Sequence, residues 1–341
     1  MIRRAAPLAV AALLCAACGG GNESSEPTAA RYLVYTRALG LPQQAIWIGD
    51  VEGQGMRRLT RGNYGLVSPD GRTIAVSRRS GIFAVAPDGG GERFVARAKA
   101  ALWLPDSRHL LAVQGKALVN IDLDDNSVAV IDRRDPASWS VSPDGKAVAY
   151  DLYEKTAGVC DGKFDVYVAD VDGSSKRRLT QDGRSSTPIW GKKRIAFGYR
   201  PVGAACYSPR VWTMRPNGAQ KEPMMRTLPK RFVGGGSGFY GVRPFAWVGG
   251  RPFLLATAPT EWGAVLAMVN TRDGKVRIPD LDPRPRAVTH MYVNDASRDG
   301  LHVVGAACGA EGPCTIRIYS VVDGRSRELE TGKVAYPDWN R

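Results

Sequence analysis

The stretch Val67-Ser-Pro-Asp-Gly-Arg-Thr-Ile-Ala-Val, residues 67–76, decides the fold. Proline fixes φ at the second position of a tight turn, and Asp and Gly tolerate the conformations that follow it. An apolar run comes directly after the turn, which is typical of a strand buried on both faces. The segment therefore predicts a hairpin whose second strand has no face in water.

Turns of this first kind recur seven times, and the others are Leu104-Pro-Asp-Ser, Val141-Ser-Pro-Asp-Gly, Trp190-Gly-Lys-Lys, Val248-Gly-Gly-Arg, Ser297-Arg-Asp-Gly and Tyr336-Pro-Asp-Trp. A second kind of turn, most often built on Asp-Gly or Asn-Gly, alternates with the first and follows the apolar runs at 46–50, 82–85, 118–121, 166–170, 211–214, 266–269 and 318–321. Asp-Gly and Asn-Gly between apolar runs are strong hairpin signals. The second turns recur about every 36 to 56 residues, which suits a four-stranded unit with variable loops.

Four short antiparallel strands per unit, repeated seven times, predict an all-β fold, a seven-bladed β-propeller. Residues 32–60 supply only three strands, so we expect the segment 334–341 to complete that blade and close the ring. A β-sandwich would show cleaner period-two alternation and no fixed unit. A helical solenoid is excluded because segments with a 3.6-residue period and caps are missing.

The first 31 residues read as targeting sequence and linker. Arg3 and Arg4 precede a short apolar run, and small residues then lead to Cys18, so residues 1–17 are predicted to be a lipoprotein signal peptide and Cys18 the lipid-bearing residue. A plain signal peptide cleaved nearby is the alternative. Residues 18–31 form a flexible linker, and 32–341 form the propeller domain.

The combination of Ser-Pro-Asp-Gly turns, Ile-Ala-Val strands and Asp-Gly hairpins that end in Arg-Arg-Leu-Thr (57–60 and 177–180) resembles the WD40-like repeats of the TolB family. The resemblance covers roughly residues 32 to 341 and is sharp in the first four blades. TolB also carries an N-terminal α/β domain, whereas about a dozen linker residues precede the first strand here. The resemblance therefore implies a TolB-like propeller lipoprotein rather than TolB itself.

The chain is basic, with 47 Lys and Arg against 33 Asp and Glu and a formal charge of +14, or +12 after removal of residues 1–17. Such a charge favours anionic lipid head groups or acidic wall polymers. The basic residues are scattered as pairs, and no aromatic-interleaved basic stripe is present, so we expect no nucleic acid partner. We expect a monomer that is held on the extracytoplasmic side of a bacterial membrane and binds an envelope protein or a cell-wall polymer.

Four cysteines follow the lipid-attachment region, an even number that suggests disulfides in an exported chain. Cys308 and Cys314 flank the tip of one hairpin and are expected to pair locally. Cys160 and Cys206 occupy the equivalent loop in successive blades and can link them if their Cα atoms come within about 7 Å. A zinc site is the alternative, but its ligand spacings are missing.

Antiparallel strands place the two kinds of turn on one face of the ring, which we call the hairpin face. The opposite face, the loop face, carries the long connections 151–165, 198–210, 229–243, 258–264, 282–290 and 305–314. Long loops on a rigid scaffold commonly carry binding residues. The loop face is therefore the predicted interaction surface, with the candidates Tyr153, Arg200, Tyr207, Phe239, Tyr240, Arg243, Trp262 and His290.

The sequence carries no recognisable catalytic motif. Nucleophile elbow, Walker loop and zincin motifs are absent, and the three histidines at 109, 290 and 302 show no carboxylate constellation in the sequence. The acidic run 122–126 lacks calcium-loop spacing and reads as a solvated turn. We therefore expect no catalytic residue, metal or cofactor. The alternative is a propeller enzyme of the lactonase or quinoprotein kind with a metal or cofactor in the central channel, but the predicted innermost stretches, 64–67, 101–104, 138–141, 187–190, 244–247, 291–294 and 334–337, contain no carboxylate or histidine.

Overall fold

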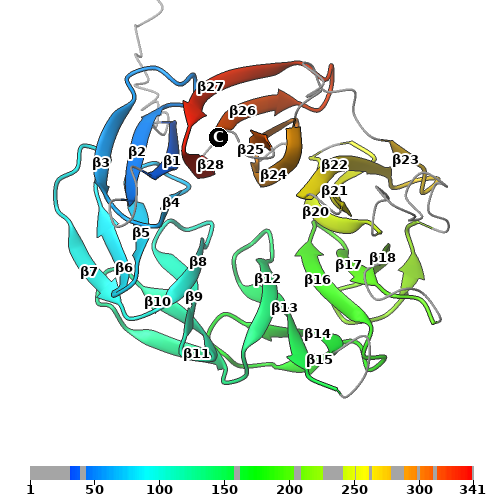
Figure 1. Cartoon of the computed structure of the whole chain (residues 1–341). Helices are drawn as coiled ribbons and strands as arrows, with labels where there is room; N and C mark the ends of the chain where they lie inside the picture. Colours follow the sequence, from blue (N-terminus) through cyan, green and yellow to red (C-terminus); the bar gives the residue numbers. More distant parts are fainter. Residues whose placement is uncertain are drawn as a thin grey trace, which may run out of the picture.

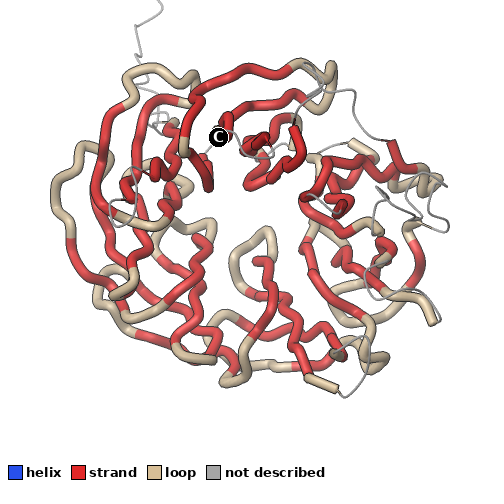
Figure 2. Tube along the Cα trace, viewed as in Figure 1, coloured by secondary structure: helices blue, strands red, loops and turns tan. Residues whose placement is uncertain are grey.

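The computed structural model describes residues 31–38, 44–156, 162–202, 209–225, 241–249, 251–260, 263–277, 288–297, 300–309 and 313–339. These residues form seven four-stranded antiparallel sheets arranged as a ring (Figure 1). The chain is a seven-bladed β-propeller, as the repeat predicts. The regular structure is strand throughout the described part, linked by short turns (Figure 2), and no described helix could span a membrane.

Each blade is a meander, and its strands run from the centre of the ring outward. Blade 1 contains β28 (Val334–Trp339), β1 (Tyr32–Ala38), β2 (Gln44–Asp50) and β3 (Arg57–Arg61). Blade 2 contains β4 (Tyr64–Val67), β5 (Ile74–Arg78), β6 (Gly81–Val85) and β7 (Arg93–Ala96). Blade 3 contains β8 (Lys99–Trp103), β9 (His109–Gln114), β10 (Ala117–Asp122) and β11 (Val128–Asp132). Blade 4 contains β12 (Pro136–Val141), β13 (Ala147–Glu154), β14 (Lys163–Asp170) and β15 (Arg177–Arg178).

The last three blades follow the same order with shorter or longer strands. Blade 5 contains β16 (Ser185–Trp190), β17 (Ile195–Tyr199), β18 (Arg210–Met214) and β19 (Glu222–Pro223). Blade 6 contains β20 (Arg243–Trp247), β21 (Phe253–Thr260), β22 (Gly263–Asn270) and β23 (Val276–Arg277). Blade 7 contains β24 (Val288–Ala296), β25 (His302–Gly309), β26 (Cys314–Ser320) and β27 (Ser326–Gly332). All three keep four strands although their turn motifs are degraded.

The ring is closed where the last strand meets the first. β28 pairs antiparallel with β1, and the register joins Leu33 to Trp339 and Arg37 to Val334. In Figure 1 this C-terminal strand lies beside the N-terminal blade, at the inner edge of the ring. The predicted closure is therefore confirmed.

The core lies between blades rather than within one. Seven clusters of buried apolar side chains each combine residues of two neighbouring blades. Successive residues of a strand enter different clusters: Ala149 of β13 packs toward blade 5, whereas its neighbours Val148 and Tyr150 pack toward blade 3. Both faces of each such strand are dry, which explains the continuous apolar runs in the sequence.

Glycines at the second turns let neighbouring blades approach closely. Gly173, in the turn after β14, has φ of 88°, and a Cβ there would collide with the Val130 carbonyl of blade 3. Gly274, in the turn after β22, has φ of 71°, and a Cβ would collide with the Met224 carbonyl of blade 5. Each glycine is needed both for its backbone conformation and for the space it leaves.

Candidate functional site

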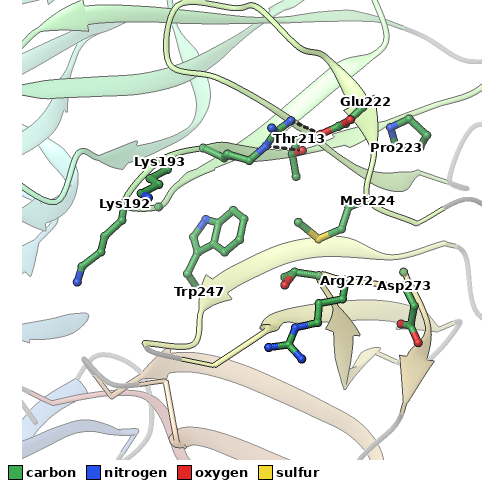
Figure 3. A pocket seen from close by; sticks show the side chains of 13 residues that line it. Lys192, Lys193, Thr213, Glu222, Pro223, Met224, Trp247, Arg272 and Asp273 are labelled. Carbon is green, nitrogen blue, oxygen red and sulfur yellow. Dashed lines mark hydrogen bonds and ion pairs between the residues drawn. The ribbon is translucent and has the colours of Figure 1, made fainter.

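A pocket of about 840 Å³ opens between blades 5 and 6 on the hairpin face (Figure 3). Its walls come from the inner turn of blade 5, the outer strand β19, the end of β20 and the outer turn of blade 6. The lining residues are Gly191, Lys192, Lys193, Arg194, Thr213, Glu222, Pro223, Met224, Trp247, Thr271, Arg272, Asp273 and Gly274. The volume is within the range of ligand-binding pockets.

The inner turn of blade 5 is shorter than its counterparts, and this creates the space. Gly191 N donates to Arg194 O at 2.8 Å, which closes a four-residue turn. The other inner turns, at 68–73, 104–109, 142–147, 248–253 and 297–302, are closed by hydrogen bonds between residues five positions apart. The blade 5 turn is therefore two residues shorter than the others. It also lacks the Pro and Asp of the Ser-Pro-Asp-Gly turns.

The floor of the pocket is apolar. The indole N–H of Trp247 donates to the Ile189 carbonyl across the blade junction at 3.1 Å. A Cβ on Gly191 would lie 2.7 Å from the Trp247 ring, so the glycine lets the indole sit against the turn. Met224 and Pro223 continue this surface from blade 5, as Figure 3 shows. Since the indole N–H is already engaged, the floor offers few hydrogen-bonding groups.

One of the four cations around the pocket is internally neutralised. Arg194 donates to Thr213 Oγ1 at 2.8 Å and to the Gln220 carbonyl at 2.8 Å, and it forms a 2.7 Å ion pair with Glu222. These contacts fix the guanidinium against the wall. Arg194 is therefore a structural part of the pocket.

The other three cations are available to a ligand. Lys192, Lys193 and Arg272 are exposed, and their side chains make no hydrogen bond or ion pair with any residue that the structure describes. Asp273, the remaining lining acid, is 3.6 Å from the ammonium group of Lys275. The pocket thus combines an apolar floor with an excess of unneutralised positive charge.

The loop-face candidates are only partly described. Tyr153 lies on β13 of blade 4. Arg200 directly follows β17, and Arg243 is the first residue of β20. Tyr153 is 44% exposed and its ring packs against Phe164, 5.1 Å between centroids. The side chain of His290 and all of Tyr207, Phe239, Tyr240 and Trp262 lie outside the described residues. The loop-face set therefore stays a prediction.

Some of the predicted loop-face excursions are strand rather than irregular loop. β13 runs to Glu154 and β14 starts at Lys163, and β21 and β22 similarly continue to Thr260 and from Gly263. The strands stay paired as far as Glu154 with Lys163 and Thr260 with Gly263. The length of these connections was thus a poor guide to loop structure.

The expectation that no carboxylate surrounds a histidine is wrong for His109. Its Nδ1 lies 2.7 Å from Asp106 Oδ2, and its Nε2 lies 3.5 Å from Asp122 Oδ2. Arg108 also pairs with Asp122, whose pKa falls to about 2, mainly because Arg108 hydrogen-bonds to it. The inner and outer turns of blade 3 come together here, which sequence distance conceals. The described residues contain no group of three or more potential metal ligands.

The expectation of innermost strands without carboxylates also needs correction. β24 and β28 extend beyond the predicted stretches and include Asp295 and Asp338, which occupy equivalent positions on adjacent blades. Asp338 Oδ2 accepts a hydrogen bond from Val67 N of blade 2 at 2.8 Å. Burial, then the charge of Asp295, raises the pKa of Asp338 well above its usual value. The pair shares a hydrogen bond that requires a proton.

Two of the four cysteines can be located. Cys308 and Cys314 are register partners across β25 and β26. Residues directly opposite each other in an antiparallel pair have Cα atoms about 4.5–5.5 Å apart, which is compatible with a disulfide. Cys160 and Cys206 lie outside the described residues, as do Cys18 and the whole targeting segment.

Sequence reasoning missed the pocket because it assigned binding to the loop face. One signal was present: Gly191-Lys-Lys-Arg replaces the acidic turn motif with three adjacent cations. The contribution of Trp247 and Met224, which are more than 20 residues further on, depends on the packing of blade 6 against blade 5.

The fold is shared with proteins of different function. No protein-family model and no curated protein matches the chain. Among solved structures, TolB from Acinetobacter baumannii superposes with a TM-score of 0.53 at 16% identity, covering 92% of this chain and 67% of TolB. An oligogalacturonate lyase in complex with manganese gives 0.59 at 13% identity, with 89% and 86% covered.

A prolyl endopeptidase structure gives a TM-score of 0.63 at 14% identity and covers 91% of this chain. The matching region is 49% of that peptidase chain. Identities this low show a common propeller architecture. Function must be argued from the residues of this chain.

Proposed function

We propose that the protein is a non-enzymatic binding scaffold that is exported and anchored through a lipid on Cys18, and that it engages an envelope protein. The observation that carries this proposal is the pocket between blades 5 and 6, where free cations surround an apolar floor on a rigid ring. Mixed apolar and cationic surfaces of this kind suit protein recognition. The TolB-like architecture is consistent with this role, and a wall polymer is the alternative partner.

Site-specific photocrosslinking of the full chain in its native envelope tests the proposal. A photoreactive residue at position 193 probes the hairpin face, and one at position 116, an exposed lysine in the turn after β9, probes the loop face. A discrete protein adduct from either face supports a scaffold. A complete lack of protein adducts from both faces, with the chain present at normal levels, would refute it.

The anchor needs a separate test. Incorporation of an alkyne-labelled fatty acid should occur in the wild-type chain and disappear in Cys18→Ser. The variant should also be released from the membrane fraction by washing, whereas the wild type is retained. Labelling that persists in the variant would place the lipid elsewhere or show that lipidation does not depend on Cys18.

A propeller enzyme is the second candidate, and the pair Asp295 and Asp338 on the innermost strands favours it. The pKa of Asp338 is raised beside Asp295, and a carboxyl group of this kind can act as an acid or a base. Metal analysis of the purified full chain, compared with Asp295→Asn, tests this candidate. A stoichiometric metal that is lost in the variant would support an enzyme and contradict the non-enzymatic proposal.

A further inference from the structure

We propose that the pocket between blades 5 and 6 binds an acidic peptide segment that inserts one large apolar side chain. This inference rests on the proposed function and specifies the chemistry of its partner. The carboxylates of the segment would pair with Lys192, Lys193 and Arg272, and the apolar side chain would pack on Trp247 and Met224.

The charges around the pocket determine the charge that the ligand must carry. Arg194 is neutralised by Glu222 at 2.7 Å, and Asp273 by Lys275, whereas the three remaining cations have no described partner. Two of these cations lie on the inner turn of blade 5 and one lies on the outer turn of blade 6, so positive charge borders the pocket on both sides of the junction. An acidic segment that crosses the junction would pass between them.

The floor determines the class of anion. A buried saccharide would need partners for its hydroxyl groups. On the floor, the Trp247 N–H already donates to Ile189 at 3.1 Å, and beside it Thr213 Oγ1 already accepts from Arg194 at 2.8 Å, so few hydrogen-bonding sites remain there. Met224 offers a thioether, which adapts readily to apolar side chains. An apolar side chain of a peptide can be buried here without an unmet hydrogen bond. The volume of about 840 Å³ also exceeds the needs of a single small anion.

The pocket is also preorganised. The turn that carries the two lysines is closed by its own backbone hydrogen bond at 2.8 Å, and Trp247 is fixed by its bond to the neighbouring blade. Because the turn and the indole need no rearrangement, the ordering of the protein on binding would be confined to the side chains of Lys192, Lys193 and Arg272.

The test uses the purified full chain and a fluorescent acidic pentapeptide with four Asp or Glu residues around a central phenylalanine. The variant Lys192→Ser/Lys193→Ser/Arg272→Ser should bind at least tenfold more weakly at 0.1 M salt, and its residual binding should depend less on salt. The control Arg72→Ser/Lys116→Ser/Lys146→Ser removes the same charge from exposed positions on blades 2, 3 and 4. It should bind within twofold of wild type.

Two further arms test the apolar contact and the class of ligand. A peptide with alanine in place of phenylalanine should bind at least fivefold more weakly, and a photoreactive phenylalanine analogue should crosslink to Met224. Equal losses in the two triple variants, equal affinity for the alanine peptide, or stronger binding of polygalacturonate would each overturn the proposal. If the peptide test fails but photocrosslinking gives protein adducts from the loop face, the scaffold function stands. If photocrosslinking in the envelope gives no protein adduct from either face, the scaffold function itself is refuted.

Discussion

Blade 5 meets its two neighbours in different ways. Toward blade 4, the carboxylate of buried Asp151 accepts hydrogen bonds from Thr187 N of blade 5 and Ser138 N of its own blade, both at 2.7 Å. Trp190 N also donates to Ser140 Oγ at 3.0 Å. Toward blade 6, the indole of Trp247 donates to the Ile189 carbonyl and Val242 N donates to the Pro209 carbonyl at 2.9 Å. On the hairpin face of this junction, three cations remain without described partners.

Both junctions have an apolar core, so the difference is confined to polar groups. Polar side chains at the first junction hold backbone N–H groups that would otherwise be buried unsatisfied. Lys192, Lys193 and Arg272 at the second junction satisfy nothing within the described chain. Groups of the first kind should determine stability, and groups of the second kind should determine binding.

Deletion of residues 334–341 should have the largest effect on stability. It removes β28, which closes the ring, and exposes the core between blades 7 and 1 around Leu33 and Tyr35. We expect loss of cooperative unfolding, or a Tm lower by about 10 °C or more, in a thermal scan followed by circular dichroism. A truncated chain that melts cooperatively at the wild-type temperature would show that closure is dispensable.

Asp151→Ala should weaken the junction between blades 4 and 5. Two buried N–H groups would lose their acceptor, so we expect the free energy of unfolding to fall by about 3 kcal/mol, measured by urea denaturation. Asp151→Asn keeps one acceptor oxygen and should cost less. Equal stability of the alanine variant and wild type would contradict the assigned role.

Gly191→Ala should introduce a steric clash at the junction between blades 5 and 6. The added Cβ would lie 2.7 Å from the Trp247 ring, and the turn and the indole would have to separate. We expect a loss of about 1–2 kcal/mol in stability and a change in tryptophan fluorescence, with Gly191→Val more severe. Unchanged fluorescence in both variants would show that the indole does not sit against the turn.

The stability contributed by Asp295 and Asp338 on the innermost strands, the channel pair, should depend on pH in a defined direction. Because the pKa of Asp338 is raised in the folded state, its contribution is fully present below the unfolded pKa of about 3.9 and is lost as the pH rises through the folded value. Asp338→Asn should therefore gain stability relative to wild type as the pH increases from 4, while its amide oxygen still accepts from Val67 N.

The control for this pH effect is Asp122→Asn. The pKa of Asp122 is lowered to about 2, so its contribution is present above pH 4 and is lost as the pH falls toward 2. The two variants should deviate from wild type in opposite directions at neutral pH. Tm differences of the same sign for both variants would contradict the assignment of the channel pair.

The smallest effect on stability should come from the cations of the pocket. Lys192→Ser and Lys193→Ser remove exposed side chains without described partners, so we expect changes within about 0.5 kcal/mol. Urea denaturation alongside Asp151→Ala sharpens the contrast between the two junctions. A loss comparable to that of Asp151→Ala would show that these lysines support the fold.

The sequence was sufficient for the ring because its signals are local. Pro, Gly, Asp and Asn mark the turns, and an uninterrupted run such as Leu110–Val113 indicates burial on two faces. The pocket could not be predicted in the same way, since Lys193 and Trp247 meet only after two blades pack. Strand ends were also hidden: the extension of β24 to Ala296 brings Asp295 near Asp338, although nothing in its neighbours along the chain indicates such a pairing.

The register of the first strand has a further implication for orientation. Tyr32 pairs with Asp50, which leads into the outer turn of blade 1, so the chain enters the ring on the same side as the pocket. Residues 19–31, fully extended, would reach about 45 Å. A fatty acyl group on Cys18 would thus tether this side of the ring toward the bilayer. A partner that binds there would have to fit between the ring and the lipid head groups.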